Sequence, residues 1–273
     1  MPILNPEQIF ALANRLPRIS TTAVKIVSYI DNPDTSREQI VNLVKTDERI
    51  FAECLKQANS AAIASVREYR TINEIVDVLG FNHVKKVALF LSAKSMIRDP
   101  NIWFESVFVA IASQYLALRA GYDRAAADRV YMAGLFQNFG AFLLKQSYPA
   151  IYSRILEIDD FQDRIKSEKQ EFGISYPEIS SLLLVKYGLP AYVTDIMSKQ
   201  PEVYSGASSQ ENAFIEIARL FSRIPNLNIA KIYADLDTDA IKSVIEVSGI
   251  ELFSITQDSV DRIERQTKEF VRA

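Results

Sequence analysis

Hydrophobic residues recur every three or four positions along almost the whole chain. This spacing places apolar side chains on one face of a helix, and no stretch alternates apolar and polar residues as a half-buried strand does. The sequence therefore predicts an all-α, multi-helix fold. The clearest groups are Ala23, Ile26, Val27 and Ile30; Phe51, Cys54, Leu55 and Ala58; Ile72, Ile75, Val76 and Leu79; Val84, Val87, Ala88 and Leu91; and Phe214, Ile217, Ala218 and Phe221.

Capping residues and glycines predict where these helices begin and end. Proline suits a first helical position, and a Ser or Thr followed three residues later by Glu or Gln forms a capping box. The predicted starts are Asn5-Pro6, Ser36 with Gln39, and Thr71 with Glu74. A glycine with positive φ closes a helix, and Gly80, Gly121, Gly173, Gly188 and Gly249 each follow a periodic run.

Residues 131–145 (YMAGLFQNFGAFLLK) are apolar on nearly every side, which is the pattern of a central, buried helix pair. Only Gln137 and Asn138 are polar in the middle of this stretch. Buried amides must be hydrogen-bonded, but they do not ionise and are poor metal ligands. Gly134 and Gly140 flank the two amides, and we expect such small residues to let neighbouring helices approach closely.

The best internal boundary is Asp99-Pro100-Asn101, which separates a lobe of short helices from a second helical half. We expect the two lobes to pack on each other, because no flexible linker lies between them. We expect residues 201–210 to form a loop. From Glu211 onward we expect further helices. The last of them could cover a lobe or contact a partner protein.

Composition limits the classes of function. The chain has 273 residues, 48% of them hydrophobic, and a net charge of -3, which argues against non-specific binding to nucleic acid or to an anionic membrane. Cys54 is the one cysteine and no leader pattern opens the sequence, so we expect a cytoplasmic protein. The longest apolar stretch, 84–97, is interrupted by Lys94 and is too short to span a bilayer.

Residues 133–140 (AGLFQNFG) resemble the segment of HD and HD-GYP phosphohydrolases that carries the His-Asp pair, with Gln137 and Asn138 in place of that pair. Further segments resemble the HDOD family, the non-hydrolytic relatives of HD-GYP domains. These are Leu16-Pro17-Arg18-Ile19, the helix 23–30, Gln57-Ala58-Asn59-Ser60-Ala61, 72–81, and Tyr187-Gly188-Leu189-Pro190. The resemblance implies an HDOD domain over 12–206, with an N-terminal lobe to about 99 and an HD-like lobe from about 101. A C-terminal helical extension, 207–273, would pack on it.

The resemblance also implies a vestigial HD pocket. The positions of the family's metal ligands fall near Glu105, Gln137, Asn138, Tyr176, Lys199-Gln200 and Arg219. An HD phosphodiesterase needs several histidines and aspartates, whereas this chain has one histidine, so we expect no metal, no cofactor and no enzymatic activity. Lys199 and Arg219 would add positive charge to the pocket, and either could pair with Glu105. The structural interpretation of these cations, as surface residues or core ion pairs, is favoured over ligand binding.

The resemblance suggests a role in bacterial signal transduction, including circuits of cyclic di-nucleotide signalling. Our leading hypothesis is an inert binding module or scaffold that contacts a signalling protein. The alternative is a sensor that binds a phosphorylated nucleotide second messenger in the vestigial pocket. A residual enzyme is a weak third hypothesis.

Other candidate sites favour structural interpretations. His83 lacks a carboxylate orienter and fits a capping turn, and Cys54 fits core packing. A basic strip of Lys85, Lys86, Lys94 and Arg98 is most simply a solvated helix face. Asp235, Asp237, Asp239 and Glu246 have the acidic spacing of a calcium loop, but Ala240 stands where that loop needs glycine. A helix over 240–248, capped by Thr238 or Asp239, is the favoured alternative.

Overall fold

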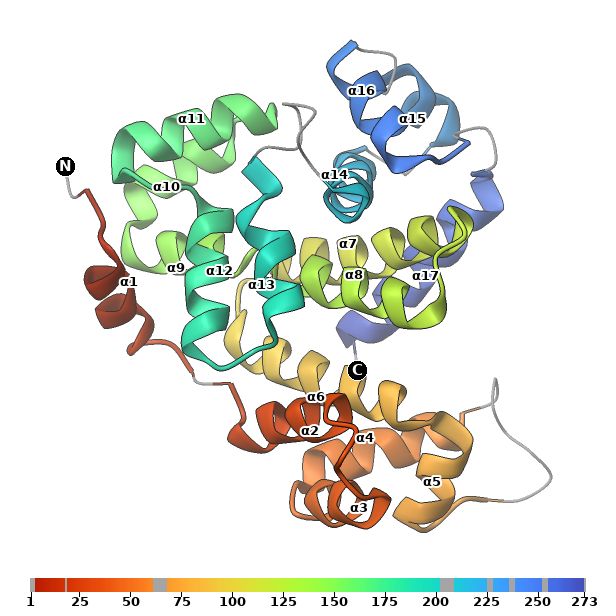
Figure 1. Ribbon diagram of the computed structural model, residues 1–273. Helices are drawn as coiled ribbons and strands as arrows, with labels where there is room; N and C mark the ends of the chain where they lie inside the picture. The colour runs from red at the N-terminus through yellow and green to blue at the C-terminus, as the bar shows by residue number, and fades with distance from the viewer. Residues whose placement is uncertain are drawn as a thin grey trace. The chain divides into compact units, whose positions relative to one another are not determined.

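The computed structural model describes residues 3–17, 19–60, 68–201, 209–224, 228–235, 239–251 and 255–272, and these ranges contain helices and no strand (Figure 1). The predicted all-α fold is confirmed. The chain divides into two compact units. Unit 2 comprises residues 17–96 and 187–190, and unit 1 comprises residues 1–16, 97–186 and 191–273.

In its described residues, unit 2 has five helices around an apolar core. The helices are α2 (Thr21–Asp31), α3 (Arg37–Lys45), α4 (Glu48–Ala58), α5 (Ile72–Leu79) and α6 (Phe81–Met96). Each contributes a fully buried side chain, namely Ile26, Val44, Cys54, Ile75 and Val84. Burial raises the pKa of the Cys54 thiol to about 12, so this cysteine is a neutral core residue.

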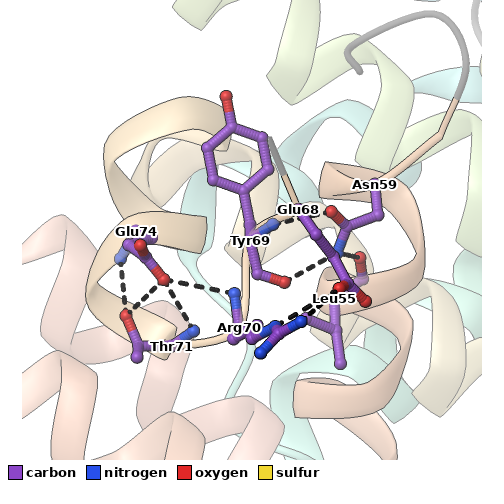
Figure 2. Close-up of polar contacts among 7 residues, drawn as sticks. All are labelled: Leu55, Asn59, Glu68, Tyr69, Arg70, Thr71 and Glu74. Atoms are coloured by element: carbon purple, nitrogen blue, oxygen red, sulfur yellow. Dashed lines mark hydrogen bonds and ion pairs between the residues drawn. The ribbon is translucent and has the colours of Figure 1, made fainter. Parts of the chain in front are cut away.

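Asn59 joins the end of α4 to the backbone ahead of α5 (Figure 2). Its Nδ2 donates to the Leu55 and Tyr69 carbonyl oxygens at 3.1 and 2.9 Å, and its Oδ1 accepts from the Tyr69 amide at 2.8 Å. Glu74 then accepts from the Thr71 amide at 3.0 Å, in the predicted capping box. One carboxamide thus satisfies three backbone groups.

The predicted helix ends agree with the structure. Capping boxes are present at Asn5, Ser36 and Thr71. The five predicted terminal glycines all have positive φ, between 67° and 87°, a conformation that other residues rarely adopt. Gly206 of the predicted loop lies outside the described residues.

The proposed basic strip is not a solvated face throughout. Lys85 is buried, and its Nζ lies 2.5 Å from a carboxylate oxygen of Asp31, in an ion pair that the sequence analysis missed. His83 Nε2 lies 2.5 Å from Gln57 Oε1, across the α4 and α6 helices. These polar groups support the helix packing of unit 2.

Unit 1 contains the remaining helices. They are α1 (Pro6–Ala13), α7 (Pro100–Arg119), α8 (Arg124–Phe136), α9 (Phe139–Ser147), α10 (Pro149–Leu156), α11 (Phe161–Phe172), α12 (Tyr176–Lys186), α13 (Ala191–Ser198), α14 (Gln210–Arg223), α15 (Ile229–Asp235), α16 (Asp239–Ser248) and α17 (Gln257–Arg272). The helices α8, α14 and α17 all pack on α7, while α9 and α13 pack on α12 (Figure 1). Residues 130–144 are buried throughout, which confirms the predicted central helix pair.

Two segments of unit 1 bear on the other sequence hypotheses. Helix α7 is long and apolar enough to cross a bilayer, but 67% of its apolar window is buried inside the protein, as is typical of a core helix. In the acidic stretch, Asp237 and Thr238 lie outside the described residues, while α16 spans Asp239–Ser248, close to the predicted helix.

Candidate functional site

The two amides of the central stretch lie where one helix gives way to the next. Gln137 is the C-cap of α8 and Asn138 is the N-cap of α9, and Asn138 makes no side-chain capping bond. Both side chains are almost completely buried. The helix break therefore presents two carboxamides to the interior of unit 1.

Ser180 of α12 holds this junction in place. Its Oγ accepts from the Gly140 amide at 2.7 Å and lies 2.8 Å from the Gln137 carbonyl oxygen and 2.9 Å from that of Tyr176. A Cβ at Gly140 would overlap the Tyr176 carbonyl oxygen, so glycine is required for this approach. The predicted close packing at Gly140 is confirmed.

Gln137 pairs with a second buried carboxamide. Gln200 Nε2 donates to Gln137 Oε1 at 3.2 Å, and neither side chain is exposed. Within the described part of the chain, Gln137 Nε2, Gln200 Oε1 and both polar atoms of Asn138 have no hydrogen-bond partner. The protein itself therefore satisfies only part of the hydrogen-bonding capacity of these amides.

A network of ionised and phenolic groups surrounds the start of α12. Glu168 accepts from the Tyr152 hydroxyl and from the Tyr176 amide, each at 2.7 Å, and lies 3.4 Å from Arg164. The Arg164 guanidinium stacks on the Tyr176 ring at 4.7 Å. Burial raises the pKa of Glu168, and the charge of Arg164 opposes that rise.

Helix α14 brings a second buried ion pair to the same region. Arg219 Nε donates to Glu216 Oε2 at 2.9 Å, and its terminal nitrogen contacts Oε1, so the pair is bidentate. Neither residue is exposed, and the guanidinium lies over the Phe161 ring at 4.0 Å. Phe161 in turn meets Tyr176 edge to face.

The charges of both ion pairs act on the phenol of Tyr176. Burial raises the pKa of its phenol to about 12. The charges of Arg219 and Arg164 lower that pKa, while Glu105 and Glu168 raise it. Glu105, on α7, is half-buried, and its Oε1 is buried without a hydrogen-bond partner in the described residues; the Tyr176 hydroxyl lacks one too. We call this set the polar cluster: Glu105, Gln137, Asn138, Arg164, Glu168, Tyr176, Gln200, Glu216 and Arg219.

A model of one protein family, described as the HDOD domain, matches residues 16–203. The chain belongs to the HDOD family. An uncharacterised protein of Treponema pallidum (strain Nichols) is 23% identical over 187 residues, in an alignment that covers 64% of this chain and 35% of that protein. The HDOD chain thus spans about a third of the length of this relative.

Solved structures share the fold. An HDOD domain protein of unknown function from Geobacter sulfurreducens has a TM-score of 0.68 at 17% identity, covering 97% of this chain and 99% of that one. A protein from Shewanella amazonensis SB2B, named as a candidate phosphohydrolase, has a TM-score of 0.71 at 19% identity, covering 97% of each chain. At these identities the likeness concerns the fold alone.

The polar cluster does not fit the metal centre that HD relatives imply. Its carboxamides and phenol are poor metal ligands, and two of its carboxylates, Glu168 and Glu216, are already paired with Arg164 and Arg219. Among the described residues, no three His, Cys, Asp or Glu side chains come together to hold a metal ion.

The predicted pocket residues divide into two groups. Glu105, Gln137, Asn138, Tyr176 and Arg219 belong to the polar cluster. Lys199 does not share their burial, because its side chain is exposed at the end of α13, and the next residue, Gln200, lies inside. Glu105 was the suggested partner of Arg219, but the bidentate partner of Arg219 is Glu216.

Sequence reasoning missed several members of the site. Glu216 and Arg219 are three residues apart, and Arg164 and Glu168 are four apart, so helical spacing signalled both ion pairs. Nothing in the sequence signalled their burial. Ser180 lies in an apolar run. Its role depends on the carbonyl of Gln137, which is 43 residues away along the chain.

Proposed function

We propose that this HDOD chain is a non-enzymatic binding module or scaffold of bacterial signal transduction that acts in the cytoplasm through protein–protein contacts. The observation that carries the proposal is the donor chemistry of the polar cluster. Carboxamides, a phenol and ion-paired guanidinium groups stand where the resemblance to HD phosphohydrolases implies a vestigial metal site. Such groups organise a core and do not activate water for attack on a phosphate.

The signalling part of the proposal draws support from a structural relative. A protein from Marinobacter aquaeolei VT8, named as a candidate signal transduction protein, has a TM-score of 0.69 at 21% identity. The match covers 97% of this chain and 64% of that one. A module that recurs as part of a longer signalling protein suits a role in recognition.

A hydrolysis assay tests the non-enzymatic part. The purified chain and its Asn138→Leu variant are incubated with a generic phosphodiester and with cyclic di-nucleotides, in turn with Mn²⁺, Mg²⁺, Fe²⁺ and Zn²⁺. We expect product at the level of the protein-free blank for both proteins. Turnover by the wild-type chain that disappears in Asn138→Leu would assign catalysis to the polar cluster and refute the proposal.

Photocrosslinking in cells tests the protein contacts. A photoreactive residue replaces one exposed apolar side chain at a time, at Tyr29 in unit 2 and at Leu118 or Val185 in unit 1. We expect one position to give a discrete covalent adduct with another protein, and the buried position Val107 to give none. Absence of adducts from all three exposed positions would count against a scaffold that uses these faces.

The alternative of a nucleotide sensor depended on two cations in the pocket. Lys199 lies at the surface, and Arg219 is committed to Glu216. The polar cluster therefore offers no uncompensated positive charge to a phosphate group, and the binding module remains the better supported proposal.

A further inference from the structure

Several polar atoms of the polar cluster are buried without a protein partner. They are Glu105 Oε1, Gln137 Nε2, Asn138 Oδ1 and Nδ2, Tyr176 OH and Gln200 Oε1, and none has a hydrogen bond within the described residues. Buried polar groups in native proteins are almost always satisfied by protein, water or ligand. Here unmatched donors and acceptors occur together.

All of these atoms belong to unit 1, and contacts link the segments that carry them. Gln200 is hydrogen-bonded to Gln137, and Asn138 is the next residue along the chain. Ser180 Oγ lies within hydrogen-bonding distance of both the Gln137 and the Tyr176 carbonyl oxygens. The charge of Glu105 acts on the Tyr176 phenol. Four separate segments, namely α7, the α8–α9 junction, the start of α12 and the segment after α13, therefore supply the unmatched groups.

Charge restricts what could satisfy them. Arg164 is paired with Glu168 and Arg219 with Glu216, so a phosphate or carboxylate would find its cations already neutralised. A metal ion would find Glu105 as the one carboxylate of the polar cluster outside these two pairs, and among the described residues no three ligand side chains come together to hold it. An uncharged molecule meets neither cost.

We propose that the polar cluster binds a small uncharged molecule of the free nucleobase class. A carboxamide presents a donor and an acceptor side by side in one plane, which matches the amide-like edges of a nucleobase, and a carboxylate accepts from base amino groups. Asn138 supplies such a pair of atoms, Gln137 Nε2 and Gln200 Oε1 supply one further donor and one further acceptor, and Glu105 supplies the carboxylate. The Tyr176 and Phe161 rings supply aromatic surface. This ligand lacks the phosphate that the nucleotide-sensor alternative requires.

The burial of the site predicts slow binding. Gln137, Tyr176 and Gln200 have no exposed surface, so the ligand enters only when the helices around them open. The observed rate should therefore reach a plateau as ligand concentration rises. Trp103, the one tryptophan, lies two positions before Glu105 on α7 and provides a fluorescence signal for this measurement.

A titration of the purified full chain tests the proposal. Adenine, guanine, hypoxanthine, cytosine and uracil are compared with AMP and GMP by calorimetry and by Trp103 fluorescence. We expect at least one free base to bind, and to bind more tightly than a nucleoside monophosphate. Binding of no base, or tighter binding of the phosphorylated compounds, would overturn the proposal.

Two matched variants separate a ligand site from a structural network. Tyr176→Phe removes a hydroxyl that has no partner in the described protein, so the melting temperature should stay the same or rise, while base affinity falls about tenfold. Tyr152→Phe removes a hydroxyl bonded to Glu168, so it should lower the melting temperature and leave base affinity unchanged. Equal affinity in wild type and Tyr176→Phe, or a crystal structure soaked with bases that holds ordered water only, would refute the proposed site.

Discussion

Asn59 in unit 2 and Asn138 in unit 1 are the same residue type in opposite circumstances. Both carboxamides stand at helix ends, but Asn59 makes three hydrogen bonds to backbone groups, while Asn138 has no side-chain partner among the described residues. Unit 2 uses polar side chains to complete its backbone, as at Thr71 and Ser36. The polar cluster of unit 1 keeps unmatched groups, so its side chains do not all serve to complete the fold.

The largest effect should come from breaking the buried pair of the polar cluster. Arg219→Met leaves the Glu216 carboxylate without its bidentate partner, and we expect a loss of about 3–5 kcal/mol in the free energy of unfolding. Urea denaturation measures this loss. The matched double variant Glu216→Leu/Arg219→Met should recover most of the stability, because no uncompensated charge remains. A double variant as unstable as the single one would show that these two side chains stabilise the fold through contacts other than their mutual ion pair.

A smaller effect should separate the two asparagines directly. Asn59→Leu leaves three backbone groups without their side-chain partner, so we expect a loss of about 2–3 kcal/mol. Asn138→Leu removes polar atoms that have no partner in the described chain, and the free energy of unfolding should change by less than about 1 kcal/mol or rise. Equal losses in the two variants, measured by urea denaturation, would remove the distinction between the regions.

The smallest effect concerns alkaline pH. The Tyr176 phenol has a pKa of about 12 in the folded protein against 10.0 as its ordinary value. Above pH 10 the unfolded chain loses this proton first, so folding stability falls as pH rises towards 12. At pH 11 the wild type should have lost about 1 kcal/mol relative to Tyr176→Phe, compared with pH 9. A stability difference between the two proteins that does not change with pH would mean that the phenol ionises equally in both states.

The sequence predicted the helices well because their signals are local. Capping boxes at Ser36 and Thr71 and the closing glycines depend on residues a few positions apart, and all appear as expected. The candidate site was predicted only in part. Gln137, Asn138 and Tyr176 could be named as pocket residues through the family resemblance. Whether Lys199 or Gln200 points into the protein depends on how the chain turns at the end of α13, where a shift of one residue exchanges the buried and the exposed side chain.

The remaining features could not be predicted because they depend on contacts between distant segments. The three backbone groups around Ser180 lie up to 43 residues away along the chain, and Gln200 is 63 residues from its partner Gln137. Whether Arg219 meets Glu216 or Glu105 depends on how α14 packs against its neighbours, since both carboxylates are chemically able to pair with it.

The decisive measurement is the metal content of the purified chain after incubation with excess Mn²⁺, Fe²⁺ or Zn²⁺ and removal of free ions. The wild type and Gln137→His/Asn138→Asp are compared by plasma mass spectrometry. We expect far less than one metal ion per chain for both, because Arg219, Arg164 and Tyr176 still occupy the polar cluster. One or more tightly held ions per wild-type chain would contradict it.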